Sequence, residues 1–156
     1  MEKLPLAPTA TGPDTAFTGH VLMESIRGPR GESRAAMNHV HFAPGARTHW
    51  HWHPVGQTLH GTAGVGLVVT RSGEVLTLEP GRTVWIPPRE VHWHSATAGA
   101  LMSHIAVQEA DEDDETVIWL EPVTTRSSSG RSPPQASEGT PCTRSDIFST
   151  AWSESR

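Results

Sequence analysis

Short runs of apolar, β-branched and aromatic residues, each followed by a glycine or proline turn signal, recur between residues 16 and 123. The clearest runs are 35–42, 64–70, 74–78, 83–86, 100–108 and 116–120. Turns close four of them at Pro44-Gly45, Ser72-Gly73, Pro80-Gly81 and Pro87-Pro88. Strands at such short, regular spacing are typical of an all-β sandwich or barrel, and no long helical period competes with them.

The chain divides into three parts by composition. Residues 1–15 predict a flexible N-terminal arm, and residues 16–123 predict one β-barrel domain. In residues 124–156, nineteen of 33 are Ser, Thr, Pro or Gly, so we expect a disordered tail. The low hydrophobic content of the whole chain, 35%, agrees with an unpacked segment.

Charge and cysteine content narrow the expected partners and location. The net charge is -5, and no block of basic residues is present, so neither nucleic acid nor an anionic membrane is an expected partner. Residues 1–14 hold three prolines and no apolar run, which is unlike a secretory signal. Cys142 is the single cysteine, so no intrachain disulfide forms. We therefore expect a cytoplasmic protein.

Histidines are concentrated in the middle of the chain: nine of the ten lie between His39 and His104. His49, His51 and His53 alternate with two tryptophans, so on one strand the three imidazoles would share a face. Two imidazoles at i and i+2 can bind one metal ion. Gln57, after a short turn, can add an amide oxygen, and His92, after a proline-bounded turn, can reach the same ion from a neighbouring strand.

These positions resemble the two motifs of the cupin family. The matching residues are Gly45, His51, His53, Gln57 and Gly64 in the first motif and Gly81, Pro87 and His92 in the second. Sixteen residues separate the motifs, a spacing similar to that of small bacterial single-domain cupins. The resemblance implies the cupin double-stranded β-helix, a jelly-roll barrel, with a metal held by His51, His53, Gln57 and His92. It also implies a homodimer.

Three positions depart from the family pattern. Gln57 stands where a glutamate is usual, Arg89 where a glycine is usual, and Ala96 where an asparagine is usual. A neutral amide leaves the metal site more positive than a carboxylate would, so we expect a stronger Lewis acid that is held less tightly. Arg89 and Ala96 concern the shape of a turn.

The segments around Trp50-His51, Val91–His94 and Ser103–Glu109 further resemble the manganese-dependent hydroxynitrile lyases among the bacterial cupins. That resemblance implies a divalent transition metal, manganese first, with iron, zinc, nickel and cobalt as alternatives. It also implies that His104 lines the pocket. We expect His104 to be an acid–base residue, because the unperturbed histidine pKa near 6.5 suits neutral pH; the alternative is a packed neutral histidine. His94 shares a face with His92 and either joins the pocket or supports the ligands.

The sequence thus predicts a metal-dependent carbon–carbon lyase acting on a small hydroxy or carbonyl compound. The alternatives are a metal-dependent dioxygenase or other oxidoreductase, and a non-catalytic cupin that binds small molecules. Three further sets of residues have expected roles outside the chemistry. We expect His49 at the pocket rim, His39 and His41 pointing away from the pocket if Val40 faces it, and the acidic run 111–115 in a solvated loop.

Overall fold

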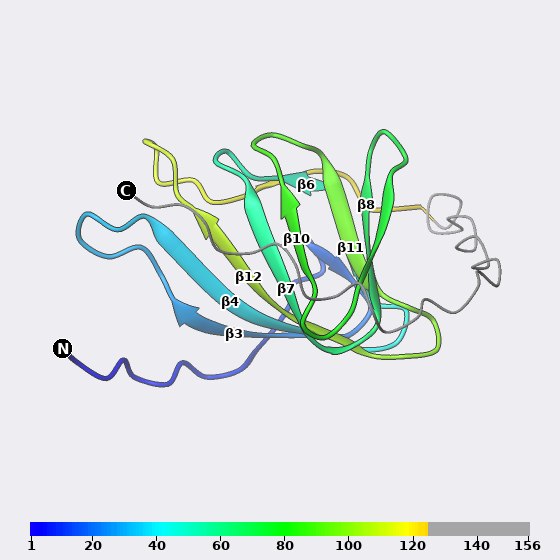
Figure 1. Ribbon diagram of the computed structural model, residues 1–156, viewed down its shortest axis with the longest axis horizontal. Coiled ribbons are helices and arrows are strands. Elements are labelled where there is room, and N and C mark those ends of the chain that lie inside the picture. Colours follow the sequence, from blue (N-terminus) through cyan, green and yellow to red (C-terminus); the bar gives the residue numbers. More distant parts are fainter. Residues whose placement is uncertain (125–156) are drawn as a thin grey trace, which may run out of the picture.

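The computed structural model describes residues 1–124, so the predicted tail lies outside the described residues from residue 125 onward. The strands are β1 (Ala10–Thr11), β2 (Phe17–Thr18), β3 (Val21–Arg27), β4 (Ala35–Phe42), β5 (Arg47–Thr48), β6 (His51–Trp52), β7 (Gln57–Gly64), β8 (Gly66–Thr70), β9 (Val75–Leu78), β10 (Thr83–Ile86), β11 (His92–Ala96), β12 (Met102–Glu109) and β13 (Ile118–Trp119). The described part of the chain contains no helix, which confirms the all-β prediction (Figure 1). It therefore also contains no helix long and apolar enough to cross a membrane.

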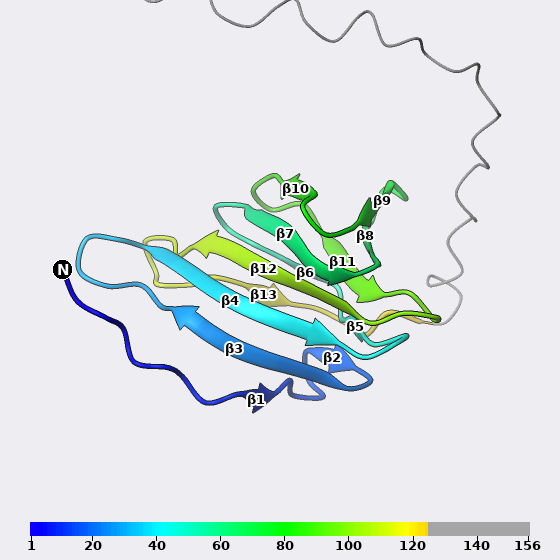
Figure 2. The same cartoon turned by 60° about the horizontal axis from the view of Figure 1, so that its bottom comes forward.

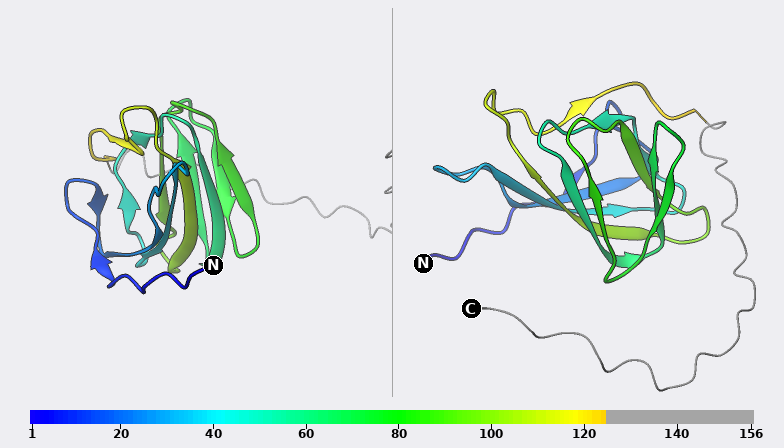
Figure 3. Two further views of the ribbon diagram at one scale, coloured as in Figure 1. Left: turned by 90° about the vertical axis from the view of Figure 1, so that its left-hand side faces the viewer. Right: turned by 45° about the horizontal axis from the view of Figure 1, so that its top comes forward.

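Two sheets form the barrel. One has the strand order β1-β3-β4-β12-β7-β10, and its strands follow one another in that order in Figure 2. The other has the order β13-β6-β11-β5-β2, with β8 pairing to β11 and β9 pairing to β8. All strand pairs are antiparallel, and the sheets curl toward each other around a common interior (Figure 3). This is the arrangement that the predicted jelly-roll barrel requires.

Alternation along the long strands builds the core. On β4, Ala36, Val40 and Phe42 are buried, while His39 and His41 on the opposite face are only half-buried. Phe42, Leu59 and Met102 are each at most 1% exposed. Burying a side chain of this size contributes about 1.5–3 kcal/mol, so a few such residues hold the two sheets together.

Two backbone positions explain how the motif turns close. Gly64 has φ +67°, and a Cβ there would lie 1.8 Å from the carbonyl oxygen of Leu101, so no other residue fits. Arg89 has φ +64°, the left-handed conformation that a glycine adopts freely. The turn shape therefore persists although the glycine is absent, and the Arg89 N–H donates to the carbonyl oxygen of His53 at 2.8 Å.

The strand predictions differ from the structure in several places. No predicted run covers β3, and none covers most of β7. The segment of alternating histidines and tryptophans is not one strand, because only His51–Trp52 is paired as β6. The predicted arm, residues 1–15, includes a short strand: Ala10 and Thr11 of β1 pair with Met23 and Leu22 of β3. The domain boundaries at residues 15 and 123 stay predictions.

Candidate metal centre and cavity

Three of the four predicted ligands come together inside the barrel. His51 on β6 lies directly opposite His92 on β11 in the antiparallel register. His53 follows β6 and reaches the same place, so that ligand atoms of these three histidines lie within 4.8 Å of one another. All three side chains are buried, at 3% exposure or less. Gln57 begins β7, and its Oε1 lies 3.2 Å from His92 Nε2.

Backbone carbonyl groups orient the three imidazoles. The Nδ1 atoms of His51, His53 and His92 lie 3.0, 2.6 and 2.9 Å from the carbonyl oxygens of His49, Thr116 and Glu90. A carbonyl oxygen only accepts, so Nδ1 carries the proton and Nε2 presents its lone pair. This is the arrangement by which metal-binding histidines are held in one tautomer and one ring position.

The Nε2 atoms of two imidazoles in this cluster carry no proton. His53 Nε2 is buried and has no hydrogen-bond partner among residues 1–124. His92 has one N–H when neutral and donates it to the carbonyl oxygen of Glu90, so its Nε2 lone pair faces the side-chain amide of Gln57 at 3.2 Å. A cation bound between such atoms would interact favourably with every one of them. The donor set present therefore fits a divalent transition metal.

Burial keeps these imidazoles neutral. Desolvation lowers the pKa of His53 and of His92 to about 4, and that of His51 falls well below its ordinary value. Neutral imidazole is the form that binds a metal, so at neutral pH none of the three must lose a proton before binding.

A cavity with about 530 Å³ of empty space, including its opening to solvent, adjoins the cluster. Its wall includes His51, His53 and Gln57, together with His94, His104 and Gln108 on β11 and β12. The predicted acid–base residues therefore share one cavity with three of the predicted ligands. His92 completes the cluster behind this wall.

His94 and His104 form a pair. His104 Nε2 lies 3.2 Å from His94 Nδ1, so one proton is shared between the rings. His104 Nδ1 and Gln108 Oε1 are buried with no hydrogen-bond partner among the described residues. Burial, with a smaller effect of His39 and His41, lowers the pKa of His104 from the ordinary 6.5 to about 3. His104 is therefore neutral in the resting protein.

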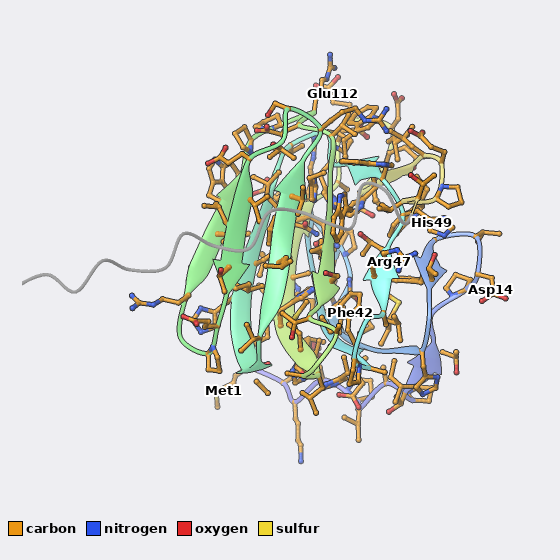
Figure 4. All side chains as sticks on the ribbon, turned by 90° about the vertical axis from the view of Figure 1, so that its right-hand side faces the viewer. Met1, Asp14, Phe42, Arg47, His49 and Glu112 are labelled. Atoms are coloured by element: carbon orange, nitrogen blue, oxygen red, sulfur yellow. The ribbon has the colours of Figure 1, made fainter. Side chains whose placement is uncertain are left out.

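The other histidines behave differently from one another. His49 is buried but absent from the cavity wall, so it is not a rim residue; Figure 4 shows it beside Arg47, on the side of the barrel toward Asp14. Its backbone N–H donates to Ala16. Val40 lines the cavity, and His39 and His41 point away from it, as predicted. His60 is exposed on the outer surface and contacts Thr83.

The acidic run folds into a turn held by its own side chain. Asp111 accepts hydrogen bonds from the backbone N–H groups of Asp113 and Glu115 at 3.0 and 2.9 Å. The following residues were missed as parts of the site: Thr116, Val117 and Trp119 line the cavity. The Trp119 ring lies 4.7 Å from that of His51. No motif spacing marks these residues, because they reach the cavity only through the pairing of β13 with β6.

Comparison with known proteins agrees with this architecture. The Cupin domain family matches residues 38–107. An (R)-mandelonitrile lyase from Granulicella tundricola is 43% identical over 113 residues, which cover 72% of this chain and 86% of the relative. The chain belongs to the cupin family. The resemblance expected from its two motifs is thereby confirmed.

Solved structures place the cupin among similar barrels. A cupin-like protein from Thermotoga maritima superposes with a TM-score of 0.71 at 33% identity, covering 81% of this chain and 94% of the other. The dimethylsulfoniopropionate (DMSP) lyase DddQ from Ruegeria pomeroyi superposes with a TM-score of 0.56 at 17% identity, covering 69% of this cupin and 53% of that lyase. At that identity the likeness concerns the fold alone.

Proposed function

We propose that this cupin is a metal-dependent hydroxynitrile lyase, which cleaves a small cyanohydrin into hydrogen cyanide and an aldehyde or ketone. One observation carries the proposal: His51 and His53 of the imidazole cluster line the same cavity as the His94–His104 pair. The 43% identity to a protein named (R)-mandelonitrile lyase supports the choice of substrate class.

His51, His53, Gln57 and His92 would hold the metal, for which we propose manganese, with iron, zinc, nickel or cobalt as alternatives. A divalent ion supplies Lewis acidity, which polarises a bound hydroxyl oxygen. Gln57 adds no negative charge to the set, so the positive charge of the ion is not reduced. The carbonyl contacts of the three histidines hold their Nε2 atoms in place before substrate arrives.

The protein residues would handle the proton. The hydroxyl O–H bond breaks, and the proton moves to the neutral His94–His104 pair. The oxygen then forms the C=O bond, and the C–C bond breaks with its electron pair leaving on cyanide. The pair returns the proton to cyanide, which departs as hydrogen cyanide. Burial makes imidazolium unfavourable here, so the proton is returned readily.

The wall of the cavity favours a small aromatic substrate. Phe17 and Trp119 have ring centroids 5.4 Å apart, and both line the cavity. Apolar and aromatic surface beside a few polar groups is the usual composition of a site for a small organic ligand. A phenyl group placed against this wall would leave its hydroxyl and nitrile groups for the polar side.

The test is metal-dependent turnover of mandelonitrile, measured by the release of benzaldehyde. Protein loaded with Mn²⁺ should be active, and chelator-treated protein should not. His104→Ala should lower turnover by roughly 10²–10⁴-fold while the metal stays bound. His92→Ala should lose both the bound metal and the turnover. His60→Ala, an exposed histidine on the outer face, is the matched control and should keep full activity.

One outcome would revise the proposal, and two would overturn it. Full activity of His104→Ala would move the base elsewhere. Absence of cyanohydrin turnover together with O₂ consumption on a small substrate would replace the lyase with an oxidoreductase. Inactivity in both assays across a broad substrate set, with metal bound, would replace it with a non-catalytic binding protein.

A further inference from the structure

A second group of metal-binding side chains lies on the outside of the barrel. Glu24 on β3 is directly opposite His39 on β4 in the antiparallel register. Their neighbours Met23 and Val40, also opposite each other, line the cavity. Because successive side chains on a strand point to opposite faces, Glu24 and His39 must point outward. The group is therefore separated from the candidate metal centre by the sheet itself.

The three ligand atoms of this outer group converge. Glu24 Oε2 lies 4.0 Å from His39 Nδ1 and 3.9 Å from His41 Nε2. The two imidazole rings are 4.1 Å apart, and all three ligand atoms lie within 4.8 Å of one another. A single carboxylate oxygen thus lies within 4.0 Å of two ring nitrogens.

Hydroxyl groups from three other segments hold the far side of each ligand. His39 Nε2 lies 3.1 Å from Thr62 Oγ1 on β7, and His41 Nδ1 lies 2.9 Å from Ser103 Oγ on β12. Thr9 donates to Glu24 Oε1 at 2.9 Å. Each side chain therefore has one polar atom engaged and directs the other at the same point. Supporting hydrogen bonds of this kind orient the ligands of metal sites.

We propose that Glu24, His39 and His41 bind a second divalent transition ion of the zinc type. Two imidazoles and one carboxylate are ligands that Zn²⁺ prefers, at about 2.0–2.2 Å, with a further position open to solvent. The two Glu24–imidazole distances would have to shorten by about half an ångström to reach a tetrahedral spacing at those bond lengths. The side chains are 30–39% exposed, so small rotations can bring them together.

Zn²⁺ is the probe for the test, in a Cys142→Ser background so that the single thiol adds no site. Equilibrium dialysis with elemental analysis should give two equivalents of Zn²⁺ per chain. Glu24→Gln, His39→Gln and His41→Gln should each bind one equivalent and keep a folded circular-dichroism spectrum. His60→Gln, which removes an exposed histidine of the same sheet outside the group, should still bind two.

A second variant tests the supporting hydrogen bond. Ser103→Ala leaves all three ligands in place but removes the partner of His41 Nδ1, so it should weaken the second Zn²⁺ by about 10–100-fold. Saturation of the parent protein at one equivalent that Glu24→Gln also binds would overturn the proposal. So would two equivalents in the Glu24 and His39 variants, or an equal loss in His60→Gln, which would indicate adventitious binding to surface histidines.

This site does not depend on the lyase proposal. Mandelonitrile turnover in Glu24→Gln should equal that of the parent protein, because the sheet separates Glu24 from the cavity. A negative lyase assay does not change what the Zn²⁺ stoichiometry says about the outer group. A negative Zn²⁺ result for the outer group likewise does not change what the lyase assay says about the cavity.

Discussion

His92 Nε2 faces Gln57 Oε1 at 3.2 Å while His92 Nδ1 lies 2.9 Å from the carbonyl oxygen of Glu90. A neutral imidazole has a single N–H and cannot donate to both oxygens. The Nε2 lone pair of His92 is therefore directed at the Gln57 amide in a buried position, where a cation would be stabilised by both groups. This pair of residues connects the two cupin motifs, and it is where the sequence departs from the usual glutamate.

Replacing Gln57 with glutamate tests what the amide does. A carboxylate adds a negative charge to the ligand set, so Gln57→Glu should hold the metal more tightly and polarise a hydroxyl less. We expect slower metal loss to a chelator and lower cyanohydrin turnover at saturating metal. His60→Glu adds the same charge on the exposed outer face of the same strand, β7, and should leave the metal affinity unchanged. Equal tightening in both variants would contradict a ligand role for Gln57.

Removing the metal should lower the melting temperature. A ligand that binds only the folded protein adds about 2.7 kcal/mol at a hundredfold excess over its Kd. For a chain of this size the shift is about 5–10 °C. His51→Ala should melt like the chelated parent protein and should not respond to added Mn²⁺. Identical melting curves before and after verified metal removal would argue against the centre.

Stability of the metal-free protein should fall as the solution is acidified. The folded-state pKa of His53 and of His92 is about 4, and that of His104 about 3, all below the 6.5 of an unfolded histidine. Below pH 6.5 the unfolded chain binds protons that the folded chain excludes, so the free energy of unfolding decreases. Each histidine contributes a slope of about 1.4 kcal/mol per pH unit, down to pH 4 or 3.

Urea unfolding of chelated protein between pH 7.5 and 4 measures this slope. A flat profile between pH 6.5 and 4.5 would mean that the imidazoles are already protonated in the folded state. His104→Gln, which replaces one titrating group, should reduce the slope by one proton.

The boundary at Val123 can be tested by truncation. Val123 is 3% exposed and packs with Trp93, and its carbonyl oxygen accepts a hydrogen bond from Arg47. A chain ending at Val123 should keep the metal and the melting temperature of the parent. A chain ending at Leu120 loses the buried valine and should be less stable by roughly 1.5–3 kcal/mol. Loss of metal from the chain that ends at Val123 would move the domain boundary beyond residue 123.

Replacing Arg89 with glycine should stabilise the barrel slightly. Arg89 in the left-handed conformation lowers the stability of the folded chain by about 1–2 kcal/mol, and glycine at this position would remove that strain. Glycine also gives the unfolded chain more conformational freedom, which offsets about 0.5–1 kcal/mol of the gain. Arg89→Gly should therefore raise the free energy of unfolding by about 0.5–1 kcal/mol in urea titration. A decrease would show that the arginine side chain makes a stabilising contact of its own.

The sequence by itself determined the barrel and which residues to consider around a metal. Turn signals mark the ends of strands within a few residues. The spacing of His51, His53 and His92 within two glycine-bounded motifs can also be read from the sequence without knowing which strands pair. Parity on a strand likewise separated Val40 from His39 and His41, because alternation needs only the backbone.

Only the tertiary structure decided which distant side chains meet. The ring contact of His94 with His104, the approach of Trp119 to His51, and the meeting of Glu24 with His39 and His41 all depend on strand register between segments far apart in sequence. The pKa of His104 also depended on its surroundings, since burial and not residue type sets the cost of its charge. Pairing and burial are properties of the closed barrel, which no local pattern contains.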